Sequence, residues 1–184
     1  MSTVHAGTIW ITGISASGKT TLSRALYEGL RARGVCEPLL IDGEHIRARL
    51  GHRYGYCLED RIAVHEAIVD EAAQARHVGR PVVVATISHM RQMRAHARRR
   101  LQPFLEVFLN CPAEVCAARD TKGHYARALR GEYACFIGVT DPYERSKRVG
   151  LEIDTAALSV GEASARLIDA SLVFFANYAV PRLV

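Results

Sequence analysis

One eight-residue segment near the start of the chain limits the possible folds more than any other feature. Residues 13–20 read GISASGKT, which fits the pattern G-x-x-x-x-G-K-[ST] of a phosphate-binding loop. The run Thr8–Thr12 before it is apolar and β-branched, as in a buried strand, and the residues after it show helical spacing up to Gly34. A strand, a glycine loop and a helix N-terminus in this order form a cradle for anions, because backbone N–H groups and the helix dipole face the phosphates.

Two side chains in this segment have expected chemical roles. In such loops the lysine reaches the β- and γ-phosphates of a nucleotide, and the following hydroxyl binds Mg²⁺. Here these residues are Lys19 and Thr20. The alternative, a chance glycine-rich turn, is disfavoured because the strand and helix patterns are both present.

Composition places the chain among ordinary globular proteins, with 49% hydrophobic and 23% charged residues. Its 184 residues suit a single domain, residues 1–184. No apolar run reaches the roughly 18 residues of a membrane span, and the first residues lack a signal-peptide pattern, so we expect a cytoplasmic protein without a membrane partner. The net charge of +5 suits a protein that handles anions.

Cysteine usage favours free thiols. The chain has five cysteines and no CxxC pair, which argues against both a disulfide framework and a zinc site. They are Cys36, Cys57, Cys111, Cys116 and Cys135.

Strand-like runs alternate with helical patterns, which predicts an α/β fold: a three-layer parallel sheet with helices on both faces. The strand candidates are Thr8–Thr12, Pro38–Ile41, Pro81–Ala85, Leu105–Leu109 and Leu151–Asp154. A last helix is expected from about Val160 to Tyr178. With the glycine loop, this pattern indicates a P-loop NTPase fold of the nucleotide-kinase type.

The segment Thr121–Tyr143 breaks the alternation. It is rich in Gly, Arg and Tyr and has no strong period. A stretch this long without regular structure is uncommon in a compact domain unless it is functional, so we expect a lid at about residues 121–143.

Two carboxylates follow the second strand, in the sequence Ile41-Asp42-Gly43-Glu44. Ligands of parallel sheets bind beyond the carboxyl ends of the strands, which places Asp42 and Glu44 near the phosphate site. A carboxylate there can hold Mg²⁺ or take a proton from an attacking hydroxyl. The alternative is an Asx turn, and the sequence leaves open which of the two acids is the base.

Arginines supply candidate anion ligands. Arg47 and Arg61 could grip phosphate or sulfate oxygens bidentately, although a solvated surface arginine is the simpler interpretation of each. A basic stretch is expected to form a solvated helix face, with nucleic-acid contact a distant second because no aromatic residues are interleaved. It contains Arg91, Arg94, Arg98, Arg99 and Arg100.

The eight histidines show no metal-ligand spacing. His65, His89 and His96 are expected to be surface or partly buried helix residues rather than ligands.

Several blocks read together resemble the adenylylsulfate kinase family, which phosphorylates adenosine 5′-phosphosulfate (APS). The resemblance covers roughly residues 6–155. Besides the glycine loop, the blocks are Leu40–Arg47, Gly55-Tyr56, Glu59–Arg61, Ile87-Ser88 with Arg91, Glu106–Pro112, Glu114–Cys116, Arg119-Asp120, Lys122–Tyr125, Phe136 with Gly138, and Asp141–Glu144.

This resemblance implies transfer of the γ-phosphoryl group of MgATP to the ribose 3′-hydroxyl of APS, giving 3′-phosphoadenosine 5′-phosphosulfate, as in sulfate assimilation. The catalytic residues it implies are Lys19, Asp42 and Glu44, with Thr20 and Asp42 at the metal. The ATP-binding residues it implies are Gly13, Ser15, Ala16, Ser17, Gly18, Lys19, Thr20, Thr21 and Arg119.

The resemblance also implies an acceptor site. Arg47 and Arg61 would bind the phosphosulfate end, Tyr56 and Phe136 would sandwich the base, and a lid beginning at Lys122 would close over both nucleotides. The implied substrate-binding residues are Arg47, Tyr56, Arg61, Ile87, Ser88, Lys122 and Phe136. Members of the family commonly form homodimers.

The chain departs from the family pattern mainly on the acceptor side. Where the family has Asp-Gly-Asp-Asn, this chain has Glu44 and His45 at the last two positions. An expected asparagine is Val64, an expected lysine is Ala134, and an expected threonine is Ile137. The arginine of the lid's usual Ala-Arg-Ala-Gly run is displaced by one position.

These departures keep other functions open. Loss of polar contacts would either weaken APS binding or indicate another nucleotide-linked acceptor, such as cytidine diphosphoramidate in capsule or natural-product biosynthesis. A regulator that binds nucleotides without catalysis is a further alternative. The presence of Lys19, Thr20 and Asp42 argues against it.

Overall fold

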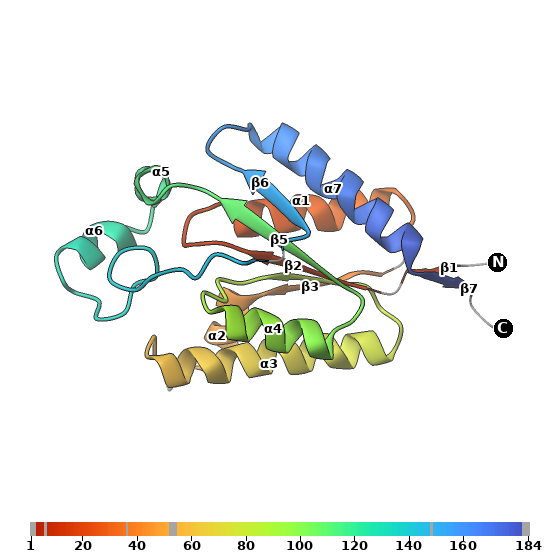
Figure 1. Ribbon diagram of the computed structural model, residues 1–184, viewed down its shortest axis with the longest axis horizontal. Coiled ribbons are helices and arrows are strands. Elements are labelled where there is room, and N and C mark those ends of the chain that lie inside the picture. Colours follow the sequence, from red (N-terminus) through yellow and green to blue (C-terminus); the bar gives the residue numbers. More distant parts are fainter. Residues whose placement is uncertain (1–2, 6, 36, 52–54, 148, 182–184) are drawn as a thin grey trace.

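The computed structural model describes residues 3–5, 7–35, 37–51, 55–147 and 149–181. The five expected strands form one parallel sheet in the order β3-β4-β2-β5-β6 (Figure 1). They are β2 (Thr8–Thr12), β3 (Leu39–Asp42), β4 (Val82–Ala85), β5 (Phe104–Asn110) and β6 (Leu151–Asp154). Ile9 of β2 lies in register with Val83 and Leu105 of its two neighbours. The α/β prediction is confirmed.

Helices cover both faces of the sheet, as Figure 1 shows, with α1 and α7 on one side and α2, α3 and α4 on the other. The helices are α1 (Lys19–Ala32), α2 (Gly43–Leu50), α3 (Leu58–His77), α4 (Arg91–Arg100), α5 (Ala113–Arg119), α6 (His124–Leu129) and α7 (Val160–Asn177).

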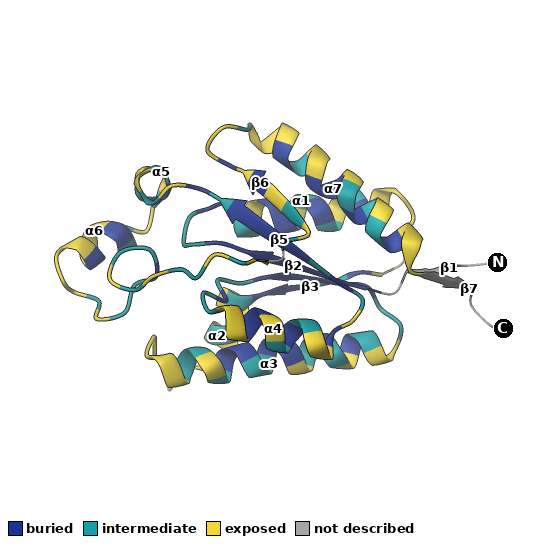
Figure 2. Cartoon of the chain, in the orientation of Figure 1, coloured by how far each residue is buried: buried dark blue, intermediate teal, exposed yellow. Residues whose placement is uncertain are grey.

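The central strand β2 serves two cores because successive side chains point to opposite faces. Ile9 and Ile11 pack with Leu26 of α1 and Leu167 of α7, whereas Trp10 packs on the opposite face, which α3 and α4 cover. The central strands β2 and β4 are buried throughout, whereas the edge strand β6 and the outer faces of the helices carry exposed residues (Figure 2). Each fully buried large apolar side chain stabilises the fold by about 1.5–3 kcal/mol.

A second, two-stranded antiparallel sheet pairs β1 (Thr3–His5) with β7 (Ala179–Pro181), two segments from opposite parts of the sequence (Figure 1). The sequence did not predict this pair. Three residues are too few to show a period of two.

The expected lid is partly helical, so the prediction of a segment without regular structure is wrong. Helix α6 lies within it and buries Tyr125 and Ala128. Six residues give only one repeat of the helical spacing, which is too little to stand out in the sequence. Helices α5 and α6 and the chain that returns from them extend together from one end of the sheet (Figure 1).

The expectation of a solvated arginine face on α4 is wrong for Arg94, which is 1% exposed. Its Nε donates to Glu106 Oε1 over 3.0 Å, and Arg98 donates to the other oxygen of Glu106 over 2.6 Å. Glu106 is itself 2% exposed on β5, and a buried carboxylate requires a charged partner. Since the carboxylate comes from another element, the helix pattern alone could not reveal the pair.

The histidine expectations also need correction. His65 on α3 is buried, with 4% exposure, and burial lowers its pKa to about 4. His89 lies in the loop between β4 and α4 rather than in a helix, whereas the half-buried His96 on α4 lies 3.0 Å from Glu66.

The four described cysteines are free thiols, as expected. Cys36 lies outside the described residues. Among the described helices, none is long and apolar enough to cross a bilayer.

Candidate active site

The glycine loop joins the carboxyl end of β2 to the start of α1. A Cβ at Gly13 would lie 2.7 Å from Ser17 Oγ and 2.9 Å from the carbonyl oxygen of Leu109, so only glycine fits there. Gly18, with φ +95°, turns the chain into α1 in a left-handed conformation that glycine adopts without strain. The backbone path therefore explains both glycines of the motif.

Lys19 is the first residue of α1, and its ammonium folds over the loop. Nζ donates to the carbonyl oxygen of Ile14 over 2.6 Å. Burial lowers the pKa of Lys19 to about 8, although the carboxylate of Glu44 opposes the shift. An ammonium has three N–H donors, and Ile14 uses one of them.

Asp42 connects the loop to the next strand. Thr20 Oγ1 donates to Asp42 Oδ2 over 2.8 Å, and the backbone N–H of Glu44 donates to Asp42 Oδ1 over 2.9 Å. One oxygen therefore faces the phosphate loop while the other caps α2, so the turn interpretation of Asp42 is confirmed and its functional role stays a prediction.

Gly43 allows this arrangement. A Cβ at this position would lie 2.9 Å from Thr86 Oγ1, so the first turn of α2 could not approach the end of β4 as closely with a larger residue.

Glu44 occupies a different environment from Asp42. Its side chain is 70% exposed and pairs with Lys122 Nζ over 2.8 Å. The ion pair joins α2 to the start of the lid. The structure therefore separates the two acids: Asp42 is 9% exposed and faces Thr20, whereas Glu44 faces solvent and the lid.

Two arginines, one on α2 and one on α3, lie close to one aromatic ring. The guanidinium carbons of Arg47 and Arg61 lie 4.6 and 5.4 Å from the ring centre of Tyr56. Burial, and then the nearby charge of Arg47, lower the pKa of Arg61. Two cations held this close together form a strong attractor for a multivalent anion.

Arg61 also connects this group to the lid. Its Nε donates to the carbonyl oxygen of Tyr56 over 2.8 Å, and its NH2 group donates to that of Cys135 over 2.9 Å. Because Cys135 precedes Phe136, one guanidinium links the backbone at both aromatic residues expected to hold the acceptor base.

The segment Ile87-Ser88 lies just beyond β4. Both of its backbone carbonyl oxygens accept hydrogen bonds from side chains of other elements. The Thr12 hydroxyl donates to Ile87, and Arg94 donates to Ser88 over 2.6 Å. Tyr143 OH lies 2.8 Å from the Thr12 hydroxyl. No sequence motif predicted a functional role for Arg94 or Thr12, whereas Tyr143 belongs to the Asp141–Glu144 block that resembles the family.

Arg119 lies on the opposite flank of the phosphate loop. It donates to the carbonyl oxygen of Thr155 over 2.8 Å, and the Thr155 hydroxyl donates to that of Ser17 over 3.1 Å. Thr155 thus ties Arg119 to the loop. No motif marked Thr155, because its partners are distant in sequence.

Two of the departures from the family pattern fall on buried positions. Val64 is 4% exposed and packs in the cluster of Trp10, Ile41 and Ile46, and Ile137 is 2% exposed. Ala134, in contrast, is exposed.

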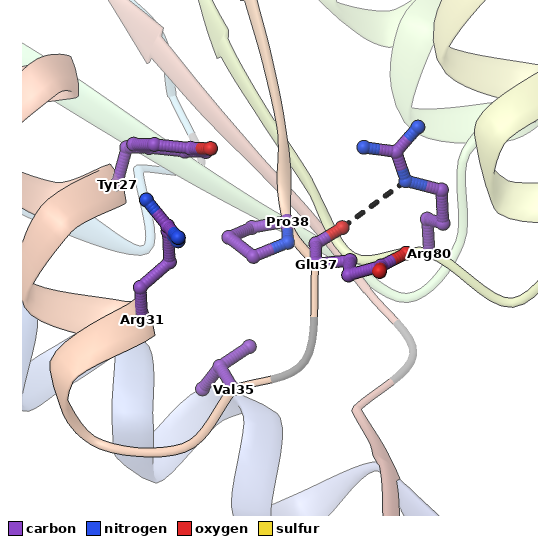
Figure 3. Close-up of a pocket in the computed structure, with 6 residues that line it drawn as sticks. All are labelled: Tyr27, Arg31, Val35, Glu37, Pro38 and Arg80. Atoms are coloured by element: carbon purple, nitrogen blue, oxygen red, sulfur yellow. Dashed lines mark hydrogen bonds between the residues drawn. The ribbon is translucent and has the colours of Figure 1, made fainter.

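A separate pocket of about 350 Å³ lies at the other edge of the sheet, where β3 and β4 begin (Figure 3). There Arg80 Nε donates to the carbonyl oxygen of Glu37 over 3.1 Å. The lining residues are Tyr27, Arg31, Val35, Glu37, Pro38 and Arg80. Since the phosphate loop follows the carboxyl end of β2, this pocket is not part of the candidate active site.

Comparisons with known proteins agree with this geometry. The family model described as adenylylsulphate kinase matches residues 5–154. An adenylyl-sulfate kinase of Paraburkholderia xenovorans is 39% identical, over 91% of this chain and 94% of the relative. One from a Picosynechococcus species is 40% identical, over 82% of this chain and 85% of the relative.

Solved structures show the same similarity. The Mycobacterium tuberculosis APS kinase in complex with AMPPNP and APS superposes with a TM-score of 0.82 at 31% identity, covering 90% of this chain and 96% of that one. A gluconokinase from Sinorhizobium meliloti, 21% identical with a TM-score of 0.60, shares the fold alone.

Proposed function

The chain belongs to the adenylylsulphate kinase family, and we propose that it transfers the γ-phosphoryl group of ATP to the 3′-hydroxyl of APS, giving 3′-phosphoadenosine 5′-phosphosulfate. The observation that carries the proposal is the grouping of Lys19, Thr20 and Asp42 at the phosphate loop, with a paired-arginine site beyond α2. Support also comes from the Mycobacterium tuberculosis relative, which was solved with both nucleotides.

ATP is assigned to the loop. The backbone N–H groups of residues 13–20 and the N-terminus of α1 suit its phosphates, since both present partial positive charge. Lys19 supplies a full charge on the same side. Arg119 is tied to the loop through Thr155. We assign it to the adenine because the family resemblance implies that role.

Magnesium fits the oxygen atoms at the end of β3. Thr20 Oγ1 and Asp42 Oδ2 lie 2.8 Å apart, and hydroxyl and carboxylate oxygens are ligands that Mg²⁺ takes alongside water and phosphate. When bound there, the ion would offset the charge on the β- and γ-phosphates.

Asp42 is the base of this proposal. It is buried beside the loop, whereas Glu44 is exposed and engaged by Lys122. A carboxylate held at the carboxyl end of β3 can accept the proton of an attacking hydroxyl, and Lys19 can hold the transferred phosphoryl group. Most of the rate enhancement then comes from positioning and charge neutralisation.

The acceptor is assigned to the site between α2, α3 and the lid. Arg47 and Arg61 provide the cationic end for a phosphosulfate group, and Tyr56 and Phe136 provide faces for the base. The lid, joined to α2 by the Lys122–Glu44 pair, would exclude the water that otherwise hydrolyses ATP.

A coupled ADP-release assay tests the proposal with MgATP and a panel of acceptors: APS, a cytidine diphosphate conjugate and plain nucleosides. We expect turnover with APS and a product phosphorylated on the 3′-oxygen. Turnover only with the cytidine conjugate would assign the same chemistry to another acceptor. Turnover with none of them would contradict kinase activity on nucleotide conjugates.

A further inference from the structure

Tyr125, in the first turn of α6, contacts the phosphate loop and an acceptor-site aromatic residue at once. Its hydroxyl donates to the carbonyl oxygen of Ser15 over 2.9 Å. Its ring meets Phe136 edge to face, with ring centres 4.9 Å apart and planes at 76°. Tyr125 is only 3% exposed, and burial raises its pKa, so the hydroxyl keeps the proton that it donates.

The bond to Ser15 fixes the direction of a loop amide. In a planar trans peptide the C=O and the following N–H point in opposite directions. Holding the carbonyl of Ser15 toward Tyr125 therefore holds the N–H of Ala16 away from it. Ala16 is strained at φ +57°, so the orientation of this peptide needs support from outside the loop.

Apolar packing reinforces the same connection. Tyr125 belongs to a cluster that contains Ile14 and Ala16 of the loop as well as Phe136. Gly138, with φ +94°, brings the returning lid chain against Ile14, because a Cβ there would lie 3.4 Å from Ile14 Cγ2. The lid and the phosphate loop thus share one packed unit.

We propose that Tyr125 is a positioning residue that couples the two nucleotide sites: nucleotide bound at the loop fixes the Ser15–Ala16 peptide, and Tyr125 transmits this order to Phe136. The inference rests on the proposed function, which places ATP at the loop and the acceptor base at Phe136. The coupling is reciprocal, so each nucleotide tightens binding of the other by the same factor.

Tyr133 provides a matched control. It stacks on Phe136 with ring centres 5.9 Å apart and planes at 15°, and its hydroxyl lies 3.0 Å from His124 Nδ1 within the lid. Tyr125→Phe and Tyr133→Phe each delete one hydroxyl from the same aromatic group. Of these two hydroxyls, the one on Tyr125 contacts the phosphate loop.

The first measurement compares the dissociation constant of APS with and without saturating AMPPNP. For the wild-type protein we expect AMPPNP to tighten APS binding by about fivefold or more, within the usual range of coupling between sites. Tyr133→Phe should keep this factor, and Tyr125→Phe should bring it close to one. A wild-type factor of one, an undiminished factor in Tyr125→Phe, or an equal loss in both variants would overturn the proposal.

The second measurement does not depend on the acceptor. In the absence of APS, the rate of hydrogen exchange in peptides covering residues 133–141 is compared with and without AMPPNP. AMPPNP should slow exchange in the wild type and in Tyr133→Phe but not in Tyr125→Phe, with each protein measured well below its own melting temperature. Equal slowing in all three proteins would refute the role of Tyr125. Failure of APS turnover with this pattern intact would refute the proposed function alone.

Discussion

Lys19 is half-buried, yet phosphate binding requires that its side chain carry a charge. Its pKa of about 8 means that, without bound phosphate, the ammonium loses its proton as the pH rises through 8. We therefore expect kcat/KM for ATP to fall above about pH 8, approaching tenfold per pH unit, since this parameter reports the free enzyme. Bound phosphates raise the pKa of the ammonium, so kcat at saturating ATP should not fall over the same range.

Initial rates from about pH 6.5 to about pH 9.5 check this expectation. Lys19→Ala should lower turnover by at least about 100-fold while the fold survives. Its rate at each pH gives the activity that does not depend on the Lys19 ammonium. A kcat/KM that stays flat to the upper limit in the wild type would show that Lys19 remains charged.

Asp42 accepts one hydrogen bond from Thr20 at the phosphate loop and one from the N–H of Glu44 at the start of α2. Asp42→Asn should distinguish its catalytic role from its role as a helix cap. Asparagine also caps helices well, so the bond to the N–H of Glu44 and the stability should be retained. The base is lost, and kcat should fall by about 10²–10⁴ with little change in the KM for ATP.

Glu44→Gln is the comparison, because it removes the neighbouring charge with the same change of size. We expect it to lower kcat by less than about tenfold. If the glutamine variant lost more activity than the asparagine variant, the base would be Glu44.

Sequence reasoning located these acids because a motif and a strand end coincide, but it could not tell how each side chain is oriented. Val64 shows the same limit. The pattern predicted a lost polar contact, and the structure places the side chain in the core under α3. Which face of a helix is buried depends on its packing partners, and those come from distant parts of the chain.

At the scale of elements, long apolar segments were predictable and short ones were not. The five strands of the main sheet begin and end within one residue of the predicted ranges. Strands buried on both faces, such as β2 and β4, give continuous apolar runs that are easily found in a sequence. The three-residue strands β1 and β7 and the six-residue helix α6 carry too little periodicity.

The junction between α4 and β5 depends on a buried charge. Arg94 binds Glu106, Ser88 and Glu144, and its side chain and that of Glu106 are each 2% exposed. We expect Arg94→Met to lower the free energy of unfolding by about 3–5 kcal/mol, because it leaves buried acceptors without their donor.

Arg98→Met is the matched control for this junction. It removes the other arginine that binds Glu106, but the Arg98 side chain is 31% exposed, so the expected cost is about 1 kcal/mol or less. Urea denaturation of both variants measures the difference. Equal costs would show that the bonds to Ser88 and Glu144 add nothing.

At the scale of the whole molecule, the candidate site is assembled at the carboxyl edge of the sheet from segments far apart in sequence. The lid meets the rest of the protein through four polar contacts described above: Lys122 with Glu44, Tyr125 with Ser15, Arg61 with Cys135, and Tyr143 with Thr12. The Tyr125 contact reaches the phosphate loop, the Tyr143 contact reaches the last residue of β2, and the other two lie on the proposed acceptor side. The lid is therefore placed to respond to both nucleotides.

We expect loss of the Lys122–Glu44 ion pair to affect acceptor binding but not the stability of the fold. Both side chains are more than half exposed, and such pairs contribute at most about 1 kcal/mol to the free energy of unfolding. Lys122→Met should therefore leave the urea midpoint nearly unchanged. It should raise the KM for the acceptor by up to about fivefold, because the lid loses its ion pair with α2, while the KM for ATP changes by less than about twofold.

The control for this variant is Arg127→Met, which breaks an ion pair of similar exposure with Glu132 inside the lid. This pair does not span the gap to α2, so its loss should leave both KM values nearly unchanged. Steady-state kinetics with each substrate varied in turn distinguish the two variants. If Lys122→Met raised the KM for ATP as much as that for the acceptor, the ion pair would serve closure of the whole site rather than the acceptor side, and the assignment of Lys122 would have to change.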